Sequence, residues 1–282
     1  MARLVVPEAD EILDQAFPVL DKGFVRLIDY MGGDARVVQA ARVSYGSGTK
    51  SVREDAGLIN YLMKNAHTSP FEQVVLTFHM KLPIFVARQV IRHRTASLNE
   101  ISGRYSVMKD EFYVPAPERV QAQSQLNKQG SGESLAPDLA EQVRQTLLNE
   151  QAGIYANYES FLELDVAREL ARVNLPVSLY TEWYWQIDLH NLFHFLRLRL
   201  DWHAQMEVRA YAEVMADLAR RVAPLCYEAF EEHVLEARRL SRKELAAVRS
   251  LLAGEAPELS EKARTELEAK LGYTLAPLPT RH

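Results

Sequence analysis

Residues 92–105 read Arg-His-Arg-Thr-Ala-Ser-Leu-Asn-Glu-Ile-Ser-Gly-Arg-Tyr, and no other stretch of the chain concentrates as much chemistry. The segment holds three guanidiniums, an imidazole, two serine hydroxyls, an amide and a single carboxylate, and it has no lysine. A solvated surface would normally mix charges of both signs. Because the planar arginine side chain binds phosphate in a bidentate manner and stacks on rings, this composition indicates a phosphorylated ligand that carries a ring.

The residues in front of this segment predict its local fold. Residues 74–81 alternate apolar and polar side chains, which is typical of a strand. Pro83 is placed to begin a helix, because its missing N–H costs nothing in a first turn. On that helix Gln89, Arg92 and His93 share a face. We therefore expect the arginine-rich segment to begin at a helix end and to continue into a loop.

Periodicity and turn residues predict the flanking elements. Residues 24–31 alternate as a strand, after which Asp34 is expected to cap a short helix. Residues 114–137, rich in Pro, Gln, Ser and Gly, predict a polar loop or insertion. Asp138 resembles a cap for a helix predicted over residues 138–163.

The remainder of the chain is predicted to be helical. One continuous helix is expected over residues 188–221. Ser241 and Glu244 form a capping box for a further helix that Gly254 ends, and residues 260–271 predict a last helix stopped by a glycine.

The composition of the whole chain is that of a globular protein, with 282 residues, 48% of them hydrophobic and 25% charged. Its net charge of −5 argues against a nucleic-acid binder, so the arginine-rich segment is a local positive site for a small anion. One cysteine, Cys226, excludes an internal disulfide, and its apolar surroundings predict a buried, unreactive thiol. We find no signal peptide pattern and no apolar run of about 18 residues, so we expect a cytoplasmic protein that binds no membrane.

Three local patterns invite other interpretations. Residues 46–51 resemble a phosphate loop, but the glycine spacing is wrong and a flexible connection is favoured. His190 and His194 could bind zinc, but Asp201, the next acidic residue on that stripe, lies about two turns away, and we expect no metal. Ser102 as a nucleophile would need an oriented base that nothing in the spacing supplies.

The segment at 92–105 also matches, at all nine fixed positions, the RHRxxSxNExSxRY signature of the flavin-dependent thymidylate synthases, the ThyX family. The following flanking stretches resemble the same family: 67–72, 78–79, 85–89, 171–176 and 196–205. The resemblance covers roughly residues 24–235. We expect residues 1–235 to form the family domain and residues 236–282 to form a helical C-terminal extension.

The patterns and the resemblance together indicate an α+β protein, with a mixed β-sheet flanked by long helices. The resemblance implies a homotetramer with active sites at subunit interfaces. It also implies the reductive methylation of dUMP to dTMP, with 5,10-methylenetetrahydrofolate as carbon donor, NADPH as reductant and FAD as hydride carrier. The chain has no GxGxxG motif, so the flavin is not expected in a Rossmann cradle.

Carried over position by position, the resemblance assigns two ligand sites. The residues implied for dUMP are Gln89, Arg92, Glu100, Ser102, Gly103, Arg104, Arg172 and Arg199. The residues implied for FAD are Ser69, Arg92, His93, Arg94, Glu100, Asp188, His190 and His194. An ionised aspartate cannot donate a hydrogen bond, so Asp188 would contact the flavin nucleotide through ribose hydroxyls.

The resemblance gives Arg199, Ser102 and His67 parts in the chemistry. Arg199 would favour ionisation of uracil N3, and physical reasoning agrees, because a permanently charged donor stabilises an imide anion. Ser102 would hydrogen-bond near the pyrimidine, and His67 would lie beside the flavin ring and the folate. On one continuous helix His190 and His194 would point nearly opposite to Arg199, so the two stripes would serve different active sites or subunits.

Two other functions stay open on the residues alone. An RNA-binding module could use Tyr105 and the arginines on single-stranded bases, although the acidic net charge and the lack of an aromatic pattern oppose it. A flavoprotein oxidoreductase without carbon transfer is excluded only by the resemblance. The following aromatic residues are expected to pack in a core or an interface: Tyr180, Trp183, Tyr184 and Trp185.

Overall fold

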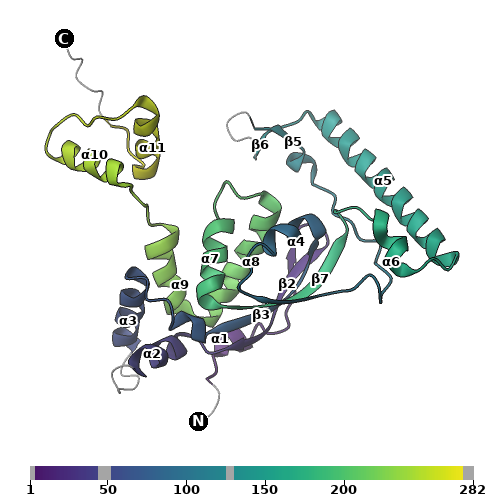
Figure 1. Cartoon of the computed structure of the whole chain (residues 1–282), viewed down its shortest axis with the longest axis horizontal. Helices are drawn as coiled ribbons and strands as arrows, with labels where there is room; N and C mark the ends of the chain where they lie inside the picture. Colours follow the sequence, from purple (N-terminus) through teal and green to yellow (C-terminus); the bar gives the residue numbers. More distant parts are fainter. Residues whose placement is uncertain (1–3, 44–51, 125–129, 276–282) are drawn as a thin grey trace. The chain divides into compact units, whose positions relative to one another are not determined.

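The computed structural model describes residues 4–43, 52–124 and 130–275. These residues belong to two compact units, Met1–Phe230 and Glu231–His282 (Figure 1). The division between residues 235 and 236 expected from the sequence stays a prediction. Residues 46–51, which resemble a phosphate loop, lie outside the described residues.

A five-stranded sheet in the order β1-β2-β3-β7-β4 forms the centre of the larger unit. Its strands are β1 (Phe17–Val19), β2 (Gly23–Met31), β3 (Val75–Pro83), β4 (Ser97–Glu100) and β7 (Tyr180–Asp188). The α+β class and the strands predicted over 24–31 and 74–81 are confirmed, but the expectation of a mixed sheet is wrong. Every neighbouring pair is antiparallel. The reason is visible at β7, whose Tyr180 pairs with Pro83, so the chain re-enters the sheet at the end where β3 stops.

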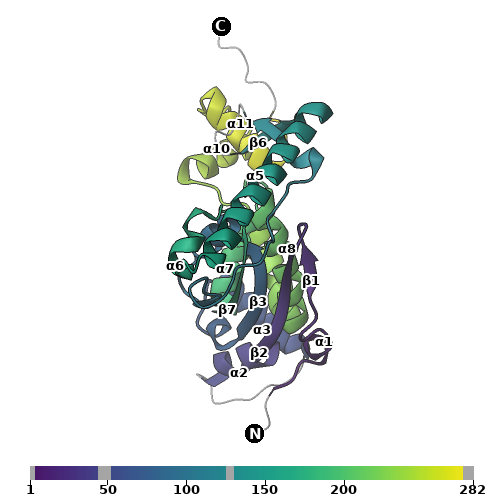
Figure 2. The ribbon, with the colours of Figure 1, turned by 90° about the vertical axis from the view of Figure 1, so that its right-hand side faces the viewer.

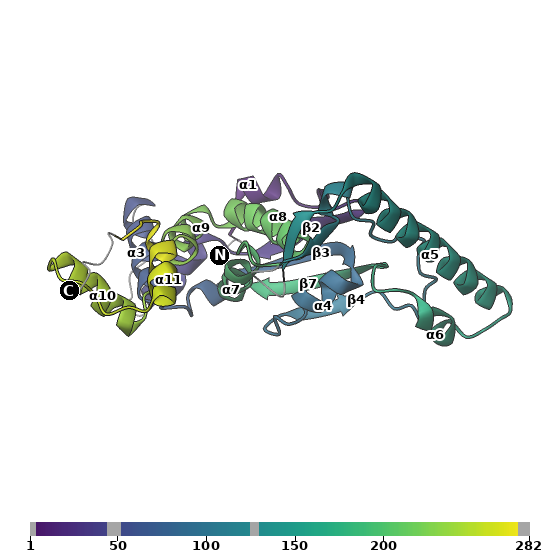
Figure 3. The same ribbon diagram turned by 90° about the horizontal axis from the view of Figure 1, so that it is seen from above.

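Helices α7 (Leu189–Arg199) and α8 (Met206–Val222) lie over one face of this sheet (Figures 1 and 3). Alternate residues of β3, among them Leu76, Phe78 and Met80, are buried. Trp183 and Trp185 of β7 are also buried, as expected, whereas Tyr184 is exposed. Figure 2 shows α8 running beside β1 and β2. The core therefore lies between these two helices and the sheet.

The single helix predicted over 188–221 is instead a strand end and two helices. Asp188 is the last residue of β7, and helix α7 ends at Arg199. The carboxylate of Asp201 accepts hydrogen bonds from the backbone N–H and the ring Nδ1 of His203, at 2.8 and 2.7 Å. This side-chain turn offers the backbone an alternative to helix and separates α7 from α8.

The remaining elements of the larger unit surround this core. They are α1 (Pro7–Asp10), α2 (Asp34–Arg42), α3 (Val52–Lys64), η2 (Phe71–Gln73), α4 (Ile84–Val90), α5 (Pro137–Glu163), α6 (Arg168–Ala171), η4 (Arg172–Asn174) and α9 (Pro224–Phe230). Asp34 begins α2, but it caps another helix. Its carboxylate accepts the backbone N–H groups of Leu225 and Cys226 in α9, each at 2.9 Å. The expected cap of α2 is therefore wrong.

The described residues of the polar stretch at 114–137 hold more regular structure than predicted. It contains the turn η3 (Pro117–Arg119) and a hairpin of β5 (Gln121–Gln123) and β6 (Ser131–Ser134). Arg119 fixes the hairpin, because it donates to Glu207 of α8 and to Ser131, each at 2.8 Å.

Helix α5 begins without the predicted cap. The residue before its first turn, Ala136, makes no side-chain cap, and Pro137 is the first helical residue. The prediction for Asp138 is therefore wrong, since a proline at this position already suits a helix start. Glu141 accepts a hydrogen bond from Arg144 instead, at 2.7 Å.

The smaller unit confirms the capping signals in its sequence. It contains η5 (Glu231–Leu235), α10 (Arg242–Leu252) and α11 (Glu261–Leu271). Ser241 and Glu244 form the capping box, and Gly254 and Gly272 have left-handed φ angles of 74° and 63° past the two helix ends. Across the described part of the chain no helix combines the length and apolarity needed to cross a membrane.

Candidate active site

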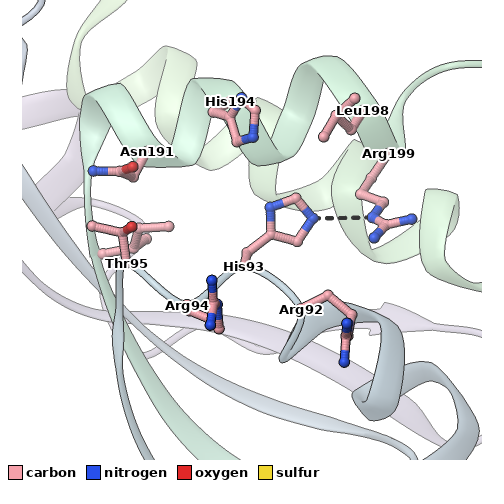
Figure 4. Close-up of a pocket in the computed structure, with 9 residues that line it drawn as sticks. Arg92, His93, Arg94, Thr95, Asn191, His194, Leu198 and Arg199 are labelled. Carbon is pink, nitrogen blue, oxygen red and sulfur yellow. Dashed lines mark hydrogen bonds between the residues drawn. The ribbon is translucent and has the colours of Figure 1, made fainter.

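A pocket of about 500 Å³ lies between α7 and the start of the arginine-rich segment (Figure 4). Five of the residues predicted for ligands line it: Arg92, His93, Arg94, His194 and Arg199. The residues that sequence reasoning missed are Thr95, Ile187, Asn191 and Leu198. The structure thus assembles the predicted positive site from two segments about a hundred residues apart.

Local structure explains why these side chains meet. Helix α4 ends at Val90, whose carbonyl accepts the backbone N–H of His93 at 3.0 Å. This bond turns the chain away from the helix, so residues 92–95 run past α7. Asn191, His194 and Leu198 recur at spacings of three and four on α7 and share one face. That spacing is the signal that could have added Asn191 and Leu198 to the prediction.

Arg199 is fixed by two acceptors on the neighbouring segment. Its Nε donates to His93 Nε2 at 3.2 Å, and its Nη2 donates to the carbonyl oxygen of Gln89 at 3.3 Å. That carbonyl belongs to the last turn of α4, where carbonyl groups lack partners within the helix. The guanidinium of Arg199 therefore has a defined orientation at the pocket wall.

The two pocket histidines are neutral near pH 7. Burial, together with the smaller effects of the Arg199 and His194 charges, lowers the pKa of His93 to about 4. Burial also lowers the pKa of His194, with contributions from Arg197 and His190. The positive charge of the pocket therefore comes from arginine, and no carboxylate is among the residues that line it. Such a site suits an anionic ligand.

Asp188 and the other histidine of α7 have different places. The carboxylate of Asp188 caps α7, accepting from the backbone N–H of Asn191 at 2.9 Å and from its side-chain amide at 2.7 Å. His190 does not line the pocket. His194 and Arg199 line the same pocket, so the expectation that they face opposite ways is wrong. The expectation neglected that a side chain at the last turn of a helix can reach across its end.

A second group of predicted residues forms around Gly103, away from the pocket lining. A Cβ added to Gly103 would lie 3.0 Å from Cδ of Arg172 and 3.1 Å from Sδ of Met108, so glycine permits this close approach. The hydroxyl of Ser102 accepts the backbone N–H of Arg104 at 3.3 Å. We call five of the predicted residues the Gly103 group: Glu100, Ser102, Gly103, Arg104 and Arg172.

The exposed members of the Gly103 group have neighbours of their own. Arg104 pairs with Glu169 at 3.1 Å, and the Glu100 carboxylate accepts from Thr181 at 2.6 Å. The segment is thus partly a strand, β4, rather than the loop that was predicted. Beyond β4, the backbone N–H of Ile101 still donates to Glu182 of β7 at 2.9 Å, and Gly103 is buried against Arg172 and Met108.

Besides Asp188 and His190, three predicted residues lie outside both groups. His67 follows α3 and packs edge-on against Tyr61, with 5.7 Å between the ring centroids. Ser69 is exposed in the turn before η2. The side-chain amide of Gln89 donates to Gln205, just before α8. None of the three lines the pocket.

The zinc alternative finds no third ligand. Within residues 4–43, 52–124 and 130–275 no three histidine, cysteine, aspartate or glutamate side chains come together as a metal site. His194 contacts His93 edge-on instead, with 5.9 Å between ring centroids.

The chain is an α+β protein whose arginine-lined pocket suits a phosphorylated ligand. Two family descriptions match the sequence: "Thymidylate synthase complementing protein" over residues 26–225 and "Thymidylate synthase ThyX C-terminal domain" over residues 239–273. The second match covers much of the C-terminal stretch that the sequence resemblance left out.

Curated relatives and a solved structure agree with this family. The flavin-dependent thymidylate synthase of Treponema denticola is 60% identical over 92% of this chain and 98% of its own, and that of Thermus thermophilus is 58% identical over 89% and 90%. The UMP/dUMP methylase PolB of Streptomyces cacaoi, bound with 5-Br dUMP, has a TM-score of 0.71 at 33% identity, covering 78% of this chain and 99% of that one. The chain belongs to the flavin-dependent thymidylate synthase family.

Proposed function

We propose that this chain catalyses the reductive methylation of dUMP to dTMP in the cytoplasm, with 5,10-methylenetetrahydrofolate as carbon donor and NADPH as reductant. The observation that carries the proposal is the pocket, whose lining includes Arg92, Arg94 and Arg199 and no carboxylate. The substrate dUMP and the cofactor FAD each carry phosphate and a ring. Arginine binds phosphate and stacks on rings.

The residues present fit FAD. Arg92 and Arg94 supply cations for a pyrophosphate, while Ile187 and Leu198 supply apolar surface for a ring. When bound there, FAD supplies hydride transfer. Neutral His194 would offer a hydrogen bond to the cofactor without adding charge. Asp188, His190, Ser69 and Glu100 remain predicted FAD ligands.

Arg199 acts on the pyrimidine. Its charge lies beside the pocket, and two of its donor nitrogens are occupied by His93 and Gln89, which leaves Nη1 for a ligand. A guanidinium held against the N3–C4 edge of uracil stabilises the N3 anion and so lowers the pKa of the imide. The anion makes C5 electron-rich, which is the atom to be methylated.

The Gly103 group supports a site shared between subunits. Arg104 and Arg172 are implied for dUMP, yet neither lines the pocket of the chain that carries them. Large apolar side chains near them are exposed, including Tyr105 at 77% and Val173 at 73%. Exposed apolar surface of this kind commonly contacts a partner. We infer that it contacts a second copy of the chain in a homotetramer and brings the two arginines to the pocket of that copy.

The proposed function is tested on the purified protein. We expect it to be yellow, or to take up FAD, and to convert dUMP to dTMP only when NADPH and methylenetetrahydrofolate are both present. Release of deuterium from C5-labelled dUMP distinguishes carbon transfer from a flavoprotein oxidoreductase that only moves electrons. A protein that stays colourless through FAD titration would contradict the proposal and favour the RNA-binding alternative.

A further inference from the structure

His93 lies between the two halves of the proposed chemistry. The family resemblance gives it a contact with the flavin and gives Arg199 a contact with dUMP, and the structure joins the two by a hydrogen bond of 3.2 Å. Figure 4 shows this bond as the dashed line, with the other ring nitrogen of His93 on the side of the ring away from Arg199. In this contact Arg199 is the hydrogen-bond donor and His93 is the acceptor.

We propose that His93 is a positioning residue for Arg199: its Nε2 accepts the Nε–H of Arg199, and this contact orients the guanidinium toward the pyrimidine. This inference rests on the proposed function and adds a link between its flavin and nucleotide sites. A guanidinium has donors and no acceptor, so the lone pair must lie on His93 Nε2. The ring proton is then on Nδ1, which leaves Nδ1–H as a donor toward the pocket.

Packing holds the histidine in this orientation. The His93 ring meets Phe195 edge-on, with 4.9 Å between centroids, and Phe195 is fully buried against Trp185. The backbone N–H of His93 is fixed by Val90. The ring therefore cannot turn away from Arg199 without disturbing the sheet core.

The charges around His93 favour its neutral form. Arg92 and Arg94 flank it on its own segment, and Arg199 and the neutral His194 face it from α7, so every charged neighbour in the pocket lining is an arginine. Protonation of His93 would add a like charge beside Arg199 and remove the acceptor at the same time. Gln89 would then be the remaining anchor of the guanidinium.

The test is the pH midpoint at which uracil N3 of bound dUMP loses its proton. Ultraviolet difference absorbance on FAD-loaded protein measures this midpoint. In His93→Leu, which has no acceptor, we expect the midpoint to rise by about one pH unit, the shift that one lost hydrogen bond to a charged group would produce. His93→Gln offers an oxygen acceptor of similar reach and should recover much of the shift.

A matched variant separates orientation from packing. Phe193→Leu removes a buried ring of α7 that stacks on Phe230 and keeps His93, Phe195 and both acceptors of Arg199, so it should lower the melting temperature without moving the dUMP midpoint. An unchanged midpoint in His93→Leu, with FAD and dUMP still bound, would overturn the inference. A wild-type protein that binds no dUMP would instead overturn the function proposed for Arg199. So would one in which bound dUMP shows no ultraviolet signal of N3 ionisation at any pH.

Discussion

The arginine-rich segment contributes to two regions of very different character. Its first half, Arg92–Thr95, packs against α7 and builds a pocket whose side chains are oriented within one chain. Its second half runs from β4 into the Gly103 group, which we call the arm, and ends at the exposed side chain of Tyr105. In the homotetramer that we propose, this one continuous signature serves two active sites: its first half forms the pocket of one, and its second half contributes to another.

The largest expected effect concerns the pocket half. Arg199→Lys should lower the rate of dTMP formation at least tenfold, about 1.4 kcal/mol or more, because a point charge cannot keep both anchors and also contact an imide edge. Reduction of the flavin by NADPH should suffer less, since that half-reaction does not involve N3. Stopped-flow measurement of both half-reactions checks this, and equal losses would show that Arg199 has only a structural role.

The next effect concerns the arm. Gly103→Ala places a methyl group 3.0 Å from Arg172, which must shift to make room, so we expect KM for dUMP to rise several-fold, by about 1 kcal/mol in binding. FAD content should stay near the wild-type value. Gly153→Ala in α5 is the matched control, because nothing lies within 4 Å of its Cβ and it should leave KM unchanged. Lost FAD rather than raised KM would mean that the arm also serves the flavin.

The pH dependence of stability reports on His93 in the pocket half. Its pKa is about 4 in the folded protein and 6.5 as the ordinary value, so the unfolded chain binds the proton first as the pH falls. Stability should therefore decrease between pH 6.5 and pH 4, beyond the decrease seen in His93→Gln. Melting temperatures of both proteins at pH 7 and pH 5 measure the difference. Parallel decreases would place His93 in a more open environment than the structure shows.

The smallest expected effect lies outside both regions. Burial raises the pKa of the Cys226 thiol, and the Asp34 carboxylate raises it further, so the thiol is not an activated nucleophile. Cys226→Ala should keep most of the methylation rate and lose about 1 kcal/mol of stability from imperfect packing. Turnover assays and thermal melts check this. A variant that folds and binds FAD yet makes no dTMP would refute the flavin-hydride mechanism.

The sequence predicted the parts of the fold that local chemistry determines. Alternation identified β2 and β3, and the Ser241–Glu244 capping box identified α10, because those signals act within a few residues. The break after α7 was missed, since it depends on a turn at Asp201 inside an otherwise helical pattern. The β5–β6 hairpin was missed because its exposed strands need no apolar alternation.

The pocket was predictable where the chain resembles the family, in the signature and at His194 and Arg199 of α7. Arg92, His93 and Arg94 were identified by identity with the family pattern, and the structure places them together. Thr95 stands at a variable position of that pattern. Asn191 lies outside the signature, and only its spacing of three residues from His194 on α7 points to it.

The most direct test of the shared site is subunit complementation. Arg199→Lys is defective in the pocket and Arg172→Ala in the arm, and the two proteins are co-expressed in equal amounts and assayed for dTMP formation. If each site takes its pocket from one chain and its arm from another, random pairing gives intact sites and about a quarter of wild-type activity. If pocket and arm of one chain form the same site, every site carries one defect, and activity no higher than that of the separate variants would contradict the account.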